Sequence, residues 1–217
     1  SLDLYQLLKP CQSLFKLSKM KQPDLENFVG IHNRKYCDGG QCIRLYKTFM
    51  KKKDPEAANI VMGHNEEDLL GLGTIFSLLA YKKLYDGEYH PKQCMILEQE
   101  LKIVIELSTA VPVNVSCGNS DFYLSVNGYE ARMLVHLKEG KLRQYYRNYK
   151  DYEFIPGEDT AMPKSITRYM DKSLKIATTP QTCYTWFNCD EDFLNNEKKQ
   201  MQYLTHTLPF FLDNLNK

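Results

Sequence analysis

The chain of 217 residues has no long apolar run and almost no excess of charge of either sign. No stretch approaches the roughly 18 consecutive apolar residues that a membrane-spanning helix needs. The first residues also lack the basic and apolar regions of a signal peptide. The formal net charge is +1, so any surface that binds phosphate must be a local patch. We therefore expect a cytoplasmic protein that does not bind membranes.

Several motifs that would identify an enzyme are missing as well. The sequence has no glycine-rich phosphate loop, no Ser-His-Asp spacing and no CxxC pair. Its cysteines number 7, and only Cys37 and Cys42 lie close together. They could form half of a zinc site, but no second close pair of cysteines or histidines exists to complete it. We expect reduced thiols rather than structural zinc.

A long helical pattern, from about residue 54 to about residue 85, carries the most informative residues. Asp54 can cap this helix and Pro55 suits its first position. Four residues separate His64 from Asp68, so one helical turn places both side chains on the same face. Such a pair can hold a metal and direct a water, or it can be a surface ion pair. The apolar positions of the helix are expected to be buried: Ile60, Val61, Leu69, Leu72, Ile75, Phe76 and Leu79.

Two stretches resemble a known family. The run from His64 through Asn65, Glu66 and Glu67 to Asp68, with the apolar turns up to Tyr81, resembles the third motif of bacterial RNase-H-like predicted exonucleases of the DEDD superfamily. A second stretch is similar to the long tail of the same proteins, over residues 148–152, 155–161, 164–165 and 169–171 and ending near Tyr184. Pro163 departs from that pattern, which has His before the Lys-Ser pair. The likeness covers residues 1 to about 187.

This resemblance implies specific roles for two residues. In the superfamily, the His or Tyr of the third motif orients the attacking water, and the Asp binds the two-metal centre. His64 and Asp68 are thus the expected catalytic residues, with Asp68 as a ligand of Mg²⁺ or Mn²⁺. The resemblance also implies a 3′–5′ exonuclease that acts on single-stranded nucleic acid.

The two earlier acidic motifs of the superfamily are not found in this sequence. They are an Asp-x-Glu on the first strand and an Asp on a helix after the fourth strand. We therefore expect the chain to be the C-terminal portion of a longer nuclease-like protein. Because the metal site would be complete only in that longer protein, we expect little or no cleavage by the chain alone.

The expected fold is α+β in two domains, residues 1–90 and 91–217. The first is expected to be part of an RNase-H-like domain, with one short strand over residues 1–5. Helices are expected over residues 11–20, 22–29 and 41–50, with a loop between the last two. Lys19 and Lys21 are either a solvated face or contacts to nucleic-acid phosphates.

After residue 87 the hydrophobic period changes to that of strands, and residues 101–107 alternate as a half-buried strand does. Asn127 and Gly128 predict a type I′ hairpin between two further strands. A second turn at residues 139–140 leads into residues 141–147, so residues 95–147 are expected to form an antiparallel meander. Arg143 and Arg147 are interleaved with tyrosines there, a pattern that can clamp single strands or belong to an ordinary half-buried sheet.

The last segments are less regular. A helix is expected from Pro163, with Ile166, Tyr169, Met170 and Leu174 on one side, and a strand over residues 182–187. Residues 188–200 are polar and expected to be mobile. The apolar segment 201–215 contains Pro209 and needs a partner surface, either its own domain or a second copy of the chain. Four charged residues are expected to act as one connected structural latch: Glu158, Asp159, Lys164 and Asp171.

Three functions remain open on the sequence. The first is part of a metal-dependent exonuclease, which depends on His64, Asp68 and the family resemblance. The second is a nucleic-acid-binding module without chemistry, which depends on the aromatic and basic sheet. The third is an accessory or self-association domain, which depends on the apolar C-terminal segment.

Overall fold

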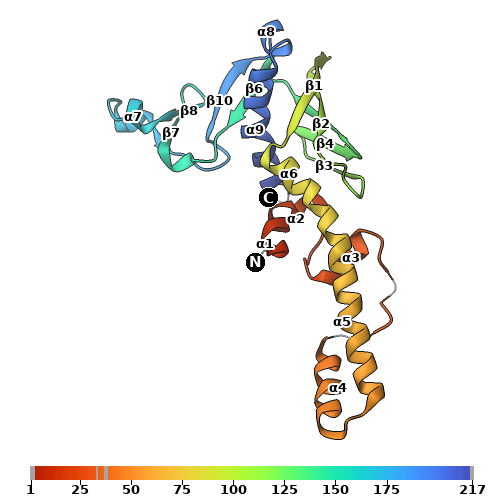
Figure 1. Cartoon of the computed structure of the whole chain (residues 1–217). Coiled ribbons are helices and arrows are strands. Elements are labelled where there is room, and N and C mark those ends of the chain that lie inside the picture. Colours follow the sequence, from red (N-terminus) through yellow and green to blue (C-terminus); the bar gives the residue numbers. More distant parts are fainter. Residues whose placement is uncertain (1–2, 33, 37–38, 216–217) are drawn as a thin grey trace. The chain divides into compact units, whose positions relative to one another are not determined.

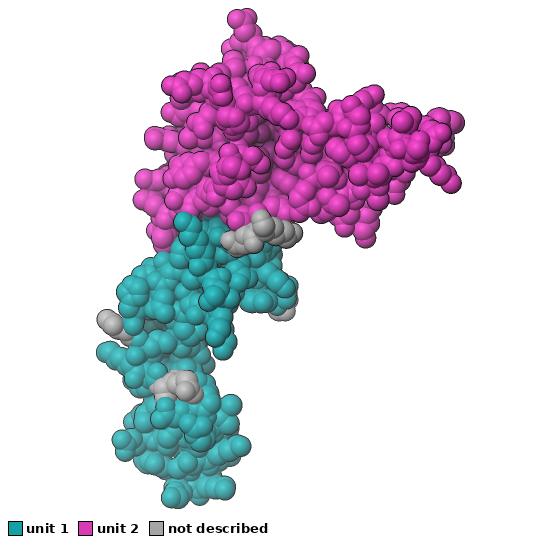
Figure 2. Space-filling model, turned by 180° about the vertical axis from the view of Figure 1, so that it is seen from behind, with its two compact units in different colours: residues 1–79 teal, residues 80–217 magenta. Residues whose placement is uncertain are grey.

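The computed structural model describes residues 3–32, 34–36 and 39–215 and divides the chain into two compact units. Unit 1 is Ser1–Leu79 and unit 2 is Ala80–Lys217, as coloured in Figure 2. The division falls inside helix α6 (Leu79–Asp86). The predicted change of period coincides with the end of this helix, because the first strand begins at Tyr89.

The described part of unit 1 contains helices and no strand (Figure 1), and the helix expected over residues 11–20 ends at Phe15. Its elements are α1 (Leu4–Leu8), η1 (Lys9–Cys11), α2 (Gln12–Phe15), α3 (Gln22–Phe28), α4 (Gly39–Lys52), α5 (Pro55–Ile75) and η2 (Phe76–Leu78). Helix α3 ends at the predicted Gly30, whose φ of 92° suits glycine. The short strand expected over residues 1–5 is wrong for Leu4 and Tyr5. Asp3 accepts a hydrogen bond from the Gln6 amide at 3.2 Å and starts a helix there instead.

Two of those expectations involve residues outside the described part of the chain. Ser1 and Leu2 of the expected strand lie outside it, and so does Cys37 of the cysteine pair considered for zinc.

The start of α5 confirms the sequence signals for that helix. Asp54 accepts a hydrogen bond from the Glu56 amide at 3.0 Å, and Pro55 occupies the first helical turn. The helical course continues through η2 and α6 to Asp86, with one 3₁₀ turn inside the predicted range.

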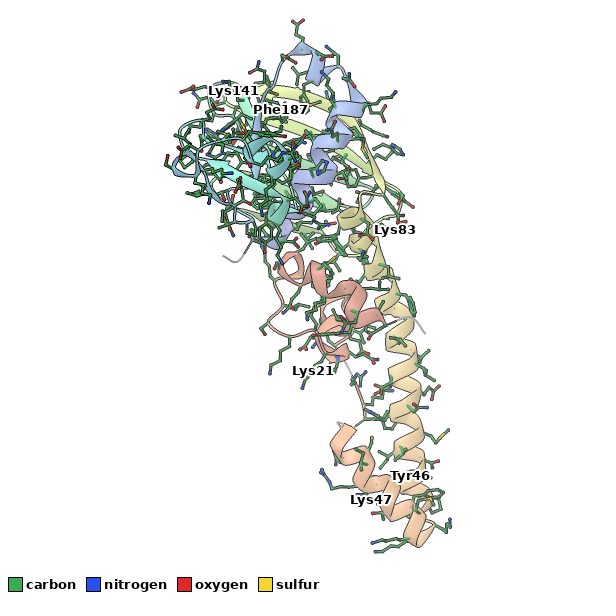
Figure 3. All side chains as sticks on the ribbon, turned by 90° about the vertical axis from the view of Figure 1, so that its left-hand side faces the viewer. Lys21, Tyr46, Lys47, Lys83, Lys141 and Phe187 are labelled. Atoms are coloured by element: carbon green, nitrogen blue, oxygen red, sulfur yellow. The ribbon has the colours of Figure 1, made fainter. Side chains whose placement is uncertain are left out.

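The apolar face of α5 is not buried as expected. Ile75 is only 1% exposed, but Leu69 is 64% and Leu72 37% exposed, and Phe76 at the start of η2 is 43% exposed. Helix α4 likewise exposes apolar side chains, including Tyr46, which is labelled in Figure 3. The reason is that the described residues of unit 1 include no strand to cover these helices. The core of unit 1 is instead made by its short helices, where the rings of Phe15 and Phe28 lie 4.9 Å apart.

Unit 2 contains a five-stranded antiparallel sheet in the order β1-β2-β5-β4-β3. The strands are β1 (Tyr89–Leu97), β2 (Glu100–Leu107), β3 (Val115–Gly118), β4 (Phe122–Asn127) and β5 (Glu130–His136). Leu101, Ile103 and Ile105 of β2 are fully buried, which confirms the alternation predicted for residues 101–107. Together with the helices on either side in sequence, this sheet confirms the α+β fold class.

The hairpin turns differ in type from the prediction. Asn127 pairs with Glu130, so the two loop residues are Gly128 and Tyr129, and only Gly128 has a positive φ. A glycine at the first loop position is the type II′ arrangement rather than type I′. The type I′ pattern occurs at the next turn, where Glu139 and Gly140 both have positive φ.

That second turn leads out of the five-stranded sheet. Strand β6 (Lys141–Tyr145) pairs with β10 (Tyr184–Asn188), which confirms the strand predicted near residues 182–187. A third sheet is formed by β7 (Tyr152–Ile155), β8 (Thr160–Pro163) and β9 (Ile176–Ala177). Unit 2 therefore has three separate sheets among its described residues.

The helix expected from Pro163 is shorter than predicted. It consists of α7 (Lys164–Thr167), and a separate 3₁₀ turn, η4 (Lys172–Leu174), follows. Asp171 accepts a hydrogen bond from the Ser173 amide at 2.8 Å and so starts the new turn. Tyr169, placed on the expected apolar side, is 78% exposed.

The polar segment 188–200 is ordered as helix, which corrects the expectation of mobility. It forms α8 (Glu191–Leu194) and the start of α9 (Glu197–Asp213). Asp190 and Asn196 explain this, because their side chains accept hydrogen bonds from the Phe193 and Lys199 amides and cap the two helices.

Helix α9 is covered by its own unit. Pro209 lies inside the helix, and Leu208 and Leu212 are at most 1% exposed. The ring of Phe211 stacks on Phe122 at 4.1 Å, and that of Phe210 stacks on Tyr145 at 3.7 Å. Of the two partner surfaces considered for this segment, unit 2 itself supplies the contacts.

Candidate functional site

His64 and Asp68 meet on α5 as their spacing predicts. The Nε2 atom of His64 lies 3.4 Å from Oδ2 of Asp68, and the His64 side chain is 13% exposed. The Nδ1 atom of His64 is buried and has no hydrogen-bond partner among the described residues. The two side chains therefore lie within ion-pair distance of each other, and their catalytic role stays a prediction.

The other oxygen of Asp68 is bound by an arginine that the sequence interpretation missed. Arg34 Nη2 lies 2.7 Å from Asp68 Oδ1 and also donates to Glu26 Oε1 at 2.7 Å. Its Nε donates to Glu26 Oε2 at 2.7 Å, so the guanidinium holds Glu26 with two parallel hydrogen bonds. We call Glu26, Arg34 and Asp68 the arginine clamp.

The two charged groups at the centre of this clamp are largely buried, and each stabilises the charge of the other. The side chain of Glu26 is only 2% exposed and that of Arg34 is 22% exposed. The hydrogen bonds from Arg34 hold the pKa of Glu26 below its ordinary value, against the opposing effect of burial. Hydrogen bonding to Glu26 raises the pKa of Arg34 in turn. Both groups are therefore charged at neutral pH.

Neighbouring groups complete the clamp. Gln22 donates to Glu26 Oε1 at 2.9 Å and to the main-chain oxygen of Asp68 at 2.7 Å, which ties α3 to α5. Gly71 leaves the space that the Glu26 carboxylate occupies, because a Cβ on Gly71 would lie 1.9 Å from Glu26 Oε1.

The segment that carries Arg34 is attached to α5 at a second point. Glu67 accepts hydrogen bonds from the main-chain amides of Lys35, at 3.0 Å, and Tyr36, at 3.3 Å. The ring of Tyr36 lies against Gly63, where a Cβ would be 2.3 Å away. Gly63 and Gly71 thus accommodate side chains from elsewhere in unit 1.

The residues present do not fit a two-metal centre. In the described parts of the chain, no three side chains of the His, Cys, Asp and Glu types lie close enough to share an ion. Asp68 directs one oxygen at Arg34 and the other at His64. A lone carboxylate binds Mg²⁺ weakly because the ion keeps most of its waters. Metal binding by Asp68 therefore needs further ligands.

Lys19 and Lys21 are exposed in unit 1. Lys21, labelled in Figure 3, stands at the start of α3, and its main-chain amide donates to Asp24 Oδ2 at 3.0 Å. Contact between these lysines and phosphates stays a prediction.

Arg143 and Arg147, predicted together as nucleic-acid contacts, have different partners. The guanidinium of Arg143 lies 4.6 Å from the ring of Tyr184 and 4.7 Å from that of Trp186. It helps to line a cavity of about 280 Å³ with Lys138 and His136. Arg147 lies 3.6 Å from Asp213 and over the ring of Tyr85, so an ion pair already occupies it.

The four residues of the expected latch do not form one connected group. Asp159 accepts hydrogen bonds from Tyr184 Oη and Trp186 Nε1, whereas Asp171 caps η4. Glu158 and Asp159 line one surface pocket, and Lys164 lines a different one. The reason is the shortened helix after Pro163, which separates Lys164 and Asp171 from the turn at Asp159.

A different set of residues joins those segments. Lys175 Nζ lies 2.9 Å from Glu153 Oε2 and donates to the main-chain oxygen of Thr167 at 2.6 Å. The buried Thr167 hydroxyl donates to the same Glu153 carboxylate. Sequence offers little signal for this arrangement, because Glu153 lies on β7, Thr167 at the end of α7 and Lys175 between η4 and β9.

Comparison with known proteins assigns a family relation to the first part of the chain. Residues 1–80 match the family model described as the RNase_H superfamily, so this stretch is similar in sequence to that family. No curated protein and no solved structure matches the chain. Within the described residues, no helix has the length and apolar character that would let it cross a membrane.

Proposed function

We propose that this chain is part of an RNase-H-like nuclease, a metal-dependent 3′–5′ exonuclease that acts on single-stranded nucleic acid in the cytoplasm. The observation that carries the proposal is the meeting of His64 and Asp68 on α5, inside the region that matches the RNase_H superfamily. A fold relation alone does not define an activity. The residue pair adds the chemistry that such an activity uses.

The donor set limits what the chain does alone. Two-metal cleavage of a phosphodiester needs several carboxylates around ions about 3.5–4 Å apart. Asp68 supplies one carboxylate, and Arg34 already neutralises it. We therefore propose that Asp68 acts with at least two further carboxylates, and that the 217 residues without them cleave little or nothing.

An exposed apolar stripe on α5 supports this requirement. The stripe comprises Met62, Leu69 and Leu72 of α5 and Phe76 at the start of η2. Leu72 follows Asp68 by one helical turn, so the stripe borders the side of the helix on which Asp68 lies. A sheet or helix that packs on this stripe would bring its own side chains beside Asp68, and contiguous exposed apolar side chains are typical of such contact surfaces.

The test is digestion of end-labelled single strands in the presence of Mn²⁺. We expect no cleavage by the 217-residue chain. We expect cleavage from the labelled end by a longer protein that contains this chain and adds the acidic motifs, and loss of that cleavage on Asp68→Ala. Glu66→Ala, on the exposed side of the same helix, is the matched control.

Two results would contradict the proposal. Robust cleavage by the 217 residues that disappears on Asp68→Ala would show that the carboxylates at hand suffice. If a longer protein with all its acidic motifs were inactive, the nuclease function would be excluded and the binding function would be favoured.

The second candidate function is binding of single-stranded nucleic acid without chemistry. The cavity beside Arg143 favours it, because a cationic group fixed between Tyr184 and Trp186 offers both charge and aromatic surface. Self-association was suggested by the apolar segment 201–215, but the apolar side chains of α9 are buried within unit 2 and so do not support it.

A further inference from the structure

A groove in unit 2 has several lysine side chains in its lining. Its volume is about 550 Å³, and it lies where η3 (Tyr149–Asp151), β7, α7, η4 and β9 come together. Four lysines line it: Lys150, Lys164, Lys172 and Lys175. We call it the lysine groove.

Three of these lysines are available to a ligand. Lys175 is only 12% exposed and is paired with Glu153, the one carboxylate among the described residues that line the groove. The other three are exposed and form no ion pair with any residue of the described chain. The groove therefore has an excess of about three positive charges, although the whole chain is nearly neutral.

The acidic residues next to the groove do not cancel this charge by direct pairing. Asp151 accepts a hydrogen bond from the Asn148 amide group at 3.1 Å. Asp171 accepts two hydrogen bonds from Ser173, each at 2.8 Å. Both carboxylates are thus committed to local turns, and the lysine ammonium groups remain available to an anion.

Aromatic rings share the groove with the lysines. Tyr149 and Tyr152 both line it and are half-buried. One face of Tyr152 packs against Tyr146, with the rings 5.2 Å apart and inclined by 15°. The main-chain oxygen of Tyr149 accepts a hydrogen bond from Thr178, which fixes the segment that carries this ring.

We propose that the lysine groove binds single-stranded nucleic acid, with the lysines on phosphates and the tyrosines on bases. Lysine ammonium groups bind successive backbone phosphates without reading sequence. Bases stack on exposed aromatic rings only when they are unpaired, which favours single strands over duplexes. The groove uses none of the residues of unit 1, so this binding goes beyond the proposed nuclease function and does not require it.

The experiment is fluorescence anisotropy of short labelled single strands of RNA or DNA with the whole chain in EDTA. The test variant is Lys164→Gln/Lys172→Gln, and the control is Lys92→Gln/Lys198→Gln, which removes the same charge from exposed positions outside the groove. The logarithm of the binding constant falls linearly with the logarithm of the salt concentration, and each lost phosphate contact reduces that slope by about 0.7. The slope of the test variant should therefore be smaller by about 1.4, and the variant should bind about 25-fold more weakly at about 0.1 M salt.

A second pair of variants tests the aromatic contact. Tyr149→Ala should weaken binding of single strands about tenfold, and Tyr149→Phe should restore it, because stacking needs the ring and not the hydroxyl. Circular dichroism verifies that all variants keep their fold.

Several results would overturn the proposal. One is an equal loss of affinity in the control and test variants. Another is a duplex that binds as tightly as the single strands, and a third is an acidic peptide that competes as well as they do. Binding is measured in EDTA and cleavage in Mn²⁺, so failure of the nuclease proposal and failure of this one are separable.

Discussion

At Arg34, one guanidinium holds two carboxylates that come from different helices, Glu26 on α3 and Asp68 on α5. The arrangement stabilises unit 1, since it joins α3 and α5 through the segment that carries Arg34. It also occupies the carboxylate that the sequence assigns to a metal. Asp68 in this state is a structural residue, and a catalytic role requires a different set of neighbours.

The clamp can be tested by removing its centre. Arg34→Ala leaves the buried Glu26 carboxylate without its partner, which costs about 3 kcal/mol in the free energy of unfolding of unit 1. Arg34→Lys keeps the charge but cannot form two parallel hydrogen bonds, so it should lose less. Hydrogen exchange of the α3 and α5 amides measures both. Equal protection in Arg34→Ala and the unaltered chain would contradict the role of the clamp.

The same clamp should make unit 1 sensitive to acid. Hydrogen bonds from Arg34 lower the pKa of Glu26 from its ordinary 4.5, so the folded state binds this proton more weakly than the unfolded state. The stabilisation is fully present above about pH 4.5 and is lost as the pH falls through the lower, folded pKa.

The measurement compares the unaltered chain with Glu26→Gln in denaturant titrations from about pH 7 downwards. The difference in unfolding free energy between the two should be constant above about pH 4.5 and shrink below it. Glu66→Gln, exposed on α5, is the control that makes the same substitution outside the clamp. A Glu26→Gln difference that stays constant or grows in acid would exclude this linkage.

Sequence reasoning reached only half of this site. The separation of four residues within one helix is enough to place His64 beside Asp68. Arg34 lies in a loop 8 residues after Glu26 and far from Asp68 in the sequence, and no periodic pattern connects it to either carboxylate. Glu26 resembles any charged residue on a surface helix, and its burial depends on how α3 packs on α5.

On the scale of elements, two glycines of α5 illustrate how packing outweighs helix propensity. Gly71 faces the Glu26 carboxylate, whereas nothing lies within 4 Å of the position that a Cβ on Gly73 would take. The sequence treats the two alike, since each is less favourable than alanine by about 1 kcal/mol in a helix interior.

The two positions should respond in opposite directions. Gly73→Ala should stabilise unit 1 by about 1 kcal/mol through helix propensity alone. Gly71→Ala should destabilise it by about 2 kcal/mol, because the new methyl group displaces Glu26 from Arg34. Thermal unfolding followed by far-ultraviolet circular dichroism compares them. If both substitutions stabilise the helix, the packing at Gly71 is not as described.

The elements themselves were predictable to different degrees. The capped start of α5 and the alternation in β2 are local signals, and both are confirmed. The burial of α5 was wrong because amphipathicity indicates which face can be buried and not whether a cover is present. The helix after Pro163 was wrong because Asp171 starts a competing turn, which the apolar spacing cannot reveal.

On the scale of the whole molecule, the two units have cores of very different extent. Unit 1 buries a few residues from short helices, such as Leu8, Leu14 and Leu25. Unit 2 buries one face of a five-stranded sheet together with the apolar side of α9. Because the apolar area removed from water sets most of the stability of a domain, unit 2 should be the more stable of the two.

We therefore expect two unfolding transitions, with unit 1 unfolding at the lower temperature. Trp186 is the only tryptophan and lies in unit 2, so its fluorescence reports that unit, whereas circular dichroism reports both.

Arg34→Ala should lower the temperature of the first transition only. Asp159→Ala should lower the free energy of unfolding of unit 2 by about 2 kcal/mol, because it removes the acceptor for Tyr184 and one of the two acceptors for Trp186, and places alanine at a φ of 50°. Asp159→Asn keeps an acceptor and tolerates that conformation, so it is the matched control. A single transition, coincident in both signals and shifted equally by Arg34→Ala and Asp159→Ala, would show that the chain unfolds as one cooperative body.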